Sequence, residues 1–246
     1  MAAVCNQKHW EVTTNPTYLN SFPLVKMGAR HNPIAHGNVV ERFNERLDNR
    51  GLKTVNQVGM LSRDHLKYVY VVDIVEENCH DDFTFTVGFV NYNNCQKAFT
   101  GIYGERVFVC SNEMYRGEDI ETRRKHTSKL DVILTDKIDG IIEHFFDFQK
   151  QRLIEIERLK NCKFTDRMLA DSVLAMTRAN VVGNTNILNV VREFDQPKYE
   201  EFHDRNAWHF QQAFTETLKK IDDPTRRMVA TNKMRDIIST VTKIDE

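Results

Sequence analysis

The hydrophobic and polar positions of this chain change their period between its first and second halves. In the first half, runs such as LKYVYVVDIVEE and FTFTVGFVNYN alternate between two faces and are rich in Val, Tyr, Phe and Thr. Alternation with these residue types is typical of β-strands. The turn-like NCHDD lies between the two runs, so we expect them to pair as an antiparallel hairpin. Two further strands are expected over TVNQVGML and over ERVFVCSN, the latter set off by Gly101 and Gly104.

After about residue 128 the apolar residues recur every three or four positions, which predicts helices. The stripe of the first helix is formed by Leu130, Leu134, Ile138, Ile141, Phe145 and Phe148. Because the pattern continues to Ile156, this helix is expected to have about 30 residues. Four more helices are expected: near Thr165, after Asn184, around Trp208, and from Pro224 with an aspartate as its cap.

The remaining N-terminal residues read as an irregular or partly extended lead over residues 1–37, interrupted by three prolines. A short helix follows, with Asn38 as its expected cap and Gly51 at its end. The lead is then followed by one domain over residues 38–246, β-rich at 52–112 and helical at 128–243. Segregated strands and helices predict an α+β fold, with an antiparallel β-rich N-terminal half packed with a helical C-terminal half.

Composition and charge narrow the range of functions. The chain has 246 residues, 41% of them hydrophobic, and a formal net charge of -1, so any nucleic-acid binding must come from a local patch. Its five cysteines form no CxxC pair, and an odd number favours a reducing compartment over a disulfide framework. Neither a signal peptide nor an apolar run long enough for a membrane helix is found in the sequence. We therefore expect a cytoplasmic protein without a membrane partner.

The most basic short run is RRKHT, residues 123 to 127, directly before the long helix. One interpretation is a phosphate-binding patch, because arginine forks and the N–H groups of a helix start both suit phosphate oxygens. The other is a solvated loop that pairs with its acidic neighbours Glu118, Asp119 and Glu121. On the first interpretation, the expected nucleic-acid-binding residues are Arg106, Arg116, Arg123, Arg124, Lys125, His126, Tyr103 and Tyr115.

Signals for catalysis, metals or cofactors are weak. Cys110 with His126 nearby could form a nucleophilic pair, but VFVC reads as a buried strand in which a cysteine is a small apolar filler. The clusters around His80, His31 and His203 match no zinc or two-histidine iron signature. No P-loop, GxSxG or GxGxxG motif is present. We therefore expect no catalytic residues, no metal and no cofactor.

Three features resemble a phage- and plasmid-encoded family, domain of unknown function 932. They are the polar NYNNCQKA after a strand, the VFVCSNEM strand after Gly104, and the basic RRKHT that opens a long helix. The late NAWHFQQAFTETLK segment also resembles the C-terminal helix of that family. The resemblance covers roughly residues 55 to 240 and implies a viral or mobile-element origin more than a reaction.

Two functions follow as expectations. The first is a non-catalytic nucleic-acid-binding protein of a phage or plasmid that acts in DNA replication, recombination or DNA handling in the bacterial cytoplasm. A sheet with aromatic and basic loop residues could hold a single strand by stacking and phosphate contacts. The alternative is a host-takeover protein that binds and inhibits a bacterial host or defence protein. Self-association remains open for either function.

Overall fold

The computed structural model describes residues 10–75, 83–107, 123–221 and 223–243, together with the backbone of residues 112–116. The chain divides into two compact units. Unit 1 is formed by Met1–Glu105 and Gly117–Asp147, and unit 2 by Arg106–Arg116 and Phe148–Glu246. The predicted single domain over residues 38–246 is not tested by this division and stays a prediction.

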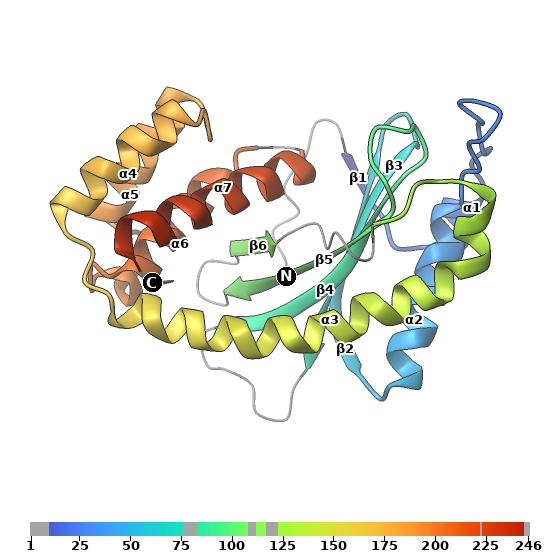
Figure 1. Cartoon of the computed structure of the whole chain (residues 1–246), viewed down its shortest axis with the longest axis horizontal. Coiled ribbons are helices and arrows are strands. Elements are labelled where there is room, and N and C mark those ends of the chain that lie inside the picture. The colour runs from blue at the N-terminus through green and yellow to red at the C-terminus, as the bar shows by residue number, and fades with distance from the viewer. Residues whose placement is uncertain (1–9, 76–82, 108–111, 117–122, 222, 244–246) are drawn as a thin grey trace. The chain divides into compact units, whose positions relative to one another are not determined.

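An antiparallel sheet dominates the first half of the chain. Its strands follow one another in sequence order: β1 (Trp10–Val12), β2 (Lys53–Ser62), β3 (Lys67–Val75), β4 (Phe83–Tyr92) and β5 (Thr100–Val107). Strands β3 and β4 pair antiparallel with Val71 opposite Gly88, which confirms the predicted hairpin. The NCHDD connection itself lies outside the described residues. Figure 1 shows these strands preceding a second half that is mostly helical, so the predicted α+β fold class is confirmed.

The N-terminal lead, expected to be irregular or partly extended, contains the strand β1, which pairs with β2, and also the helix α1 (Pro16–Asn20), which was not predicted. Helix α2 spans His36–Asn49 and has Ala35 rather than Asn38 at its cap position. A short strand, β6 (Asn112–Arg116), overlaps the end of the VFVCSNEM segment but was not predicted as a strand of its own.

The predicted fourth strand starts too late, because Gly101 lies inside β5 rather than before it. A Cβ atom at Gly101 would approach the side chain of Ile141 to 2.6 Å. This glycine therefore serves close packing of the long helix on the strand, whereas its sequence context reads as a turn.

Two helices complete the core of unit 1. Helix α2 buries Val39, Val40, Phe43 and Leu47. Helix α3 spans Ser128–Asn161, and its 34 residues confirm the predicted long helix. Within unit 1 it buries the predicted stripe from Leu130 to Phe145.

Two arginines of α2, and Arg50 directly after it, join this helix to α3 by ion pairs. Arg46 forms two hydrogen bonds to the carboxylate of Asp139, both of 2.8 Å. Arg50 reaches the same carboxylate at 3.3 Å and that of Glu143 at 3.1 Å. Arg42 pairs with Asp131 at 3.2 Å. The cations of α2 are therefore engaged within the fold.

Unit 2 is built around one almost fully buried helix, α6 (Ala207–Leu218). The other described elements are the end of α3, β6, α4 (Asp166–Arg178), α5 (Asn184–Asp195), the 3₁₀ helix η1 (Glu200–Phe202) and α7 (Pro224–Thr242). The four predicted C-terminal helices are confirmed. Thr165 and Asp223 accept hydrogen bonds from the first turns of α4 and α7, as expected for cap residues.

Candidate functional site

The basic run RRKHT forms a loop of unit 1 that leads directly into α3, which begins at Ser128. Its backbone is held at two points. The N–H and C=O groups of Arg124 exchange two hydrogen bonds of 2.9 Å with Phe99, and the carbonyl of His126 accepts one of 3.0 Å from the N–H of Asn32. The loop therefore lies against two other segments, one before α2 and one between β4 and β5.

His126 is buried, and this corrects its predicted place among the nucleic-acid-binding residues. Its Nε2 donates a 2.6 Å hydrogen bond to Oδ1 of Asn91, while Nδ2 of Asn91 donates to Nδ1 of His36 at 2.8 Å. Desolvation by burial, and then repulsion from His31 and His36, lower the pKa of His126 to about 4. Burial likewise lowers the pKa of His36 to about 4. His126 is thus a neutral anchor of the loop near pH 7 and supplies no surface charge.

Three segments that meet at this loop carry seven cations and no acidic residue. They are residues 26–32, 94–99 and 123–130, and their cations are Lys26, Arg30, Lys97, Arg123, Arg124, Lys125 and Lys129. We call these seven residues the basic surface. Contacts join the segments, because the ring centroid of His31 lies 6.0 Å from that of His126 and because Arg124 bridges to Phe99. Figure 1 shows the start of α3 and the chain around α1 on the same side of unit 1.

The exposed cations of the basic surface differ from those of α2 in how they are engaged. Lys26, Arg30, Lys125 and Lys129 are exposed, and within the described ranges no ion pair is found for any of them. By contrast, Arg42 and Arg46 of α2 and Arg50 directly after it all pair with acidic residues of α3. The exposed charges of the basic surface are thus available to an anionic partner.

The predicted site residues are only partly brought together. Arg123 and Lys125 are exposed, and Arg124 is half-buried. Tyr103 is buried, with 7% of its surface exposed, so its predicted contact with a nucleic acid was wrong, because a stacking side chain must be accessible. Tyr92, the last residue of β4, is buried as well, so its ring is not accessible for stacking either.

Three other predicted residues are not tested. Arg106 belongs to unit 2 and makes interactions within the protein, so its contribution stays a prediction. The side chains of Tyr115 and Arg116 lie outside the described residues. Four cations of the basic surface were missed by sequence reasoning. Lys26, Arg30 and Lys97 lie in segments that only tertiary contacts bring to RRKHT, whereas Lys129 lies in the first turn of α3, two residues after RRKHT.

The described residues offer no metal centre: no group of three or more His, Cys, Asp or Glu residues among them could hold an ion. Cys110, the candidate nucleophile, lies outside the described residues, and so does His80 with its acidic neighbours. Among the described helices, none is long and apolar enough to cross a membrane.

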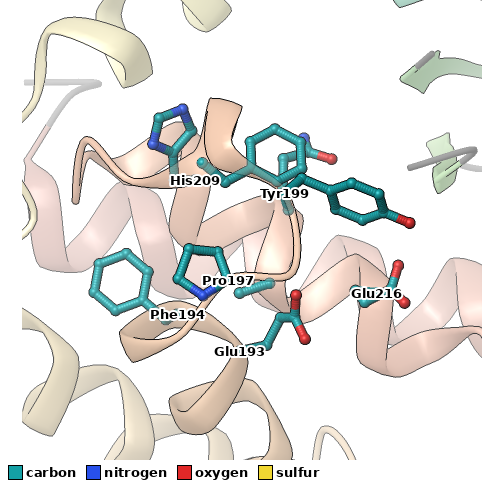
Figure 2. Close-up of a pocket in the computed structure, with 9 residues that line it drawn as sticks. Glu193, Phe194, Pro197, Tyr199, His209 and Glu216 are labelled. Carbon is teal, nitrogen blue, oxygen red and sulfur yellow. The ribbon is translucent and has the colours of Figure 1, made fainter. Parts of the chain in front are cut away.

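A small pocket of unit 2, drawn in Figure 2, is lined by acidic and aromatic side chains. The carboxylates of Glu193 and Glu216 lie on one side of it, and the rings of Phe194 and His209 on the other. Nζ of Lys198 lies 2.7 Å from Glu216 and 3.8 Å from Glu193. Burial alone would raise the pKa of Glu216, but hydrogen bonds from Lys198 and Lys219 hold it below its usual value. The protein's own lysines therefore neutralise this acidic pair, which indicates a structural role.

Comparisons of the chain with protein-family models, with curated proteins and with solved structures found no match. The resemblance to the phage and plasmid family therefore stays a prediction.

Proposed function

We propose that this chain is a non-catalytic nucleic-acid-binding protein, encoded by a phage or plasmid and acting in DNA replication, recombination or DNA handling. The observation that carries this proposal is the gathering of seven cations from three segments that contain no acidic residue. The phage or plasmid setting rests on the resemblance of the RRKHT region to that family. No catalytic step is part of the proposal.

Phosphate recognition fits the chemistry of this surface. Arginine and lysine contacts to phosphate oxygens release counterions from the nucleic acid, which drives binding without sequence preference. The whole chain carries a net charge of only -1, so a general attraction to anions is weak and a local surface must supply the affinity. The buried His126 and the Arg124–Phe99 bridge support the same function, because a loop held in place loses less entropy on binding.

The test is the salt dependence of DNA binding, measured by fluorescence anisotropy with a labelled oligonucleotide. The variant carries Arg30→Ala, Lys125→Ala and Lys129→Ala, three exposed cations without ion pairs in the described part of the chain. Folding should be nearly unchanged, because exposed substitutions of this kind shift stability by less than about 0.5 kcal/mol each. Affinity should fall for all sequences, and the slope of log K against log salt should flatten by up to about 2.7, or about 0.9 per lost phosphate contact.

A matched control removes the same charge from unit 2. Lys163→Ala, Lys220→Ala and Arg226→Ala also replace three exposed cations and should leave both the affinity and the salt slope near the wild-type values. If both triple variants weaken binding equally, the attraction is diffuse and the basic surface is not the site. If the wild-type protein binds no DNA, the proposal fails and a host-protein partner becomes the function to test by pull-down from bacterial lysate.

A further inference from the structure

An exposed apolar segment borders the basic surface. Leu24, Val25 and Met27 are 50%, 47% and 45% exposed. Thirteen large hydrophobic residues are exposed in the described structure, and three of them lie in the four residues 24–27. Lys26, a member of the basic surface, stands between them. Exposed apolar residues that cluster on a surface are typical of sites where a partner binds.

This segment is connected to the RRKHT loop by several contacts. The backbone N–H of Met27 donates a 3.0 Å hydrogen bond to Nδ1 of His31. The ring of His31 lies beside that of His126, and the N–H of Asn32 bonds the His126 carbonyl. The apolar segment is therefore tied to the RRKHT loop through His31 and Asn32.

Resting on the proposed function, we propose that the basic surface takes single-stranded nucleic acid, with phosphates on its cations and unpaired bases against Leu24, Val25 and Met27. In a duplex the base faces are stacked and hidden, whereas in a single strand they are apolar surfaces that gain from contact with aliphatic side chains. Tyr103, one of the two rings expected to stack on bases, is buried, so the proposal assigns the base contact to the exposed aliphatic segment.

Amide side chains favour a nucleic acid over an anionic lipid surface as the occupant. Asn94 and Gln96 lie beside Lys97 in the segment that bridges to RRKHT, and Gln96 is exposed. No side-chain hydrogen bond of Gln96 is found within the described ranges. Asparagine and glutamine hydrogen-bond to bases and sugars, whereas the hydrocarbon of a membrane offers them no partner.

The test compares a single strand and its duplex in the same anisotropy assay. The variant is Leu24→Ala, Val25→Ala and Met27→Ala, and the control is Leu174→Ala, Leu188→Ala and Val229→Ala, which removes three apolar side chains of similar exposure from helices of unit 2. The first variant should bind the single strand on the order of 10-fold more weakly. Its duplex affinity and its salt slope should stay at the wild-type values, because no charge is removed.

The other outcomes separate this inference from the proposed function. Suppose that the wild-type protein binds both the single strand and the duplex. If the apolar variant then binds both as tightly as the wild type does, or loses equal affinity for both, the base contact is overturned and the phosphate function stays intact. If the wild-type protein binds neither the single strand nor the duplex, the base contact and the phosphate-binding function are both overturned. Phosphatidylserine vesicles form the last arm: tight vesicle binding that is lost in the apolar variant, with single-strand affinity unchanged, would assign the segment to a lipid surface instead. Unchanged thermal midpoints of both variants confirm that each one is folded.

Discussion

Acidification should destabilise unit 1 through its buried histidines. Nδ2 of Asn91 can only donate, so Nδ1 of His36 accepts from it and the His36 proton lies on Nε2, 3.1 Å from the carbonyl of His65. Protonating His36 at Nδ1 would set two donors against each other. Asn91 is held in this orientation, because its Nδ2 also donates to the carbonyl of Ile34 and its Oδ1 accepts from His126. The network is therefore satisfied only with neutral histidines.

The size of the effect follows from the two pKa values. His36 and His126 have pKa values of about 4 in the folded protein and 6.5 as the reference value of the free side chain. Because the unfolded chain takes up protons first, this contribution to stability is complete above pH 6.5 and is lost as the pH falls toward 4. At pH 5 the loss is about 2 kcal/mol for one such histidine. Both together give at most about 4 kcal/mol, since their charges interact.

Neighbouring groups change the size of this loss of stability but not its sign. Asp64 attracts a proton on His36 and so opposes the shift, but the residue is exposed and water screens its charge. The hydrogen bond of His36 to the His65 carbonyl also raises the pKa of His36, whereas the charge of the His65 ring lowers it. The charge of His31 lowers the pKa of His126, in the same direction as burial. Burial remains the largest cause for both groups.

Urea unfolding at pH 7.5 and at pH 5.0 measures the loss directly. The His36→Gln variant lacks one of the two titrating groups. From pH 7.5 to pH 5.0 the free energy of unfolding should therefore drop by about 2 kcal/mol less in this variant than in the wild type. His203→Gln changes an exposed histidine and should keep the full wild-type pH dependence. Equal stability of the wild-type protein at both pH values, or a His36→Gln variant as acid-sensitive as the wild type, would refute the neutral buried network.

Three further predictions concern packing and the cysteines. Phe145→Ala should lower the free energy of unfolding by about 3–5 kcal/mol, because the ring is fully buried, whereas Val132→Ala at an 83% exposed position should change it by less than about 0.5 kcal/mol in the same urea titration. Gly101→Ala should cost about 1–3 kcal/mol through its clash with Ile141, and adding Ile141→Ala should make the glycine change cost less, as a double-mutant cycle would show. All five cysteines should react with a thiol reagent in denatured protein without prior reduction; fewer than five would indicate a disulfide.

The sequence alone determined the type and order of the main elements. The periods of strands and helices are local properties of the sequence. The alternation of residues between two faces therefore predicted β3 and β4, and the apolar stripe from Leu130 to Phe145 predicted the first part of α3. Cap residues such as Asp223 are local as well, since a carboxylate needs only the N–H groups of the next turn. Gly101 shows the limit of this reasoning, because a glycine that makes a turn and one that admits a helix side chain look alike in sequence.

Only the tertiary structure decided which charges are available and which polar residues are buried. The arginines of α2 find their acidic partners in α3, with Arg46 and Asp139 separated by 93 residues, and no local pattern contains that pairing. In the same way, His126 adjoins three exposed or half-buried cations in sequence but is buried by contact with Asn91, 35 residues earlier. The run RRKHT can be read from the sequence, but its partners Lys26, Arg30 and Lys97 join it only through long-range backbone contacts. Side-chain environment depends on such contacts between distant segments, whereas backbone period depends on neighbours along the chain.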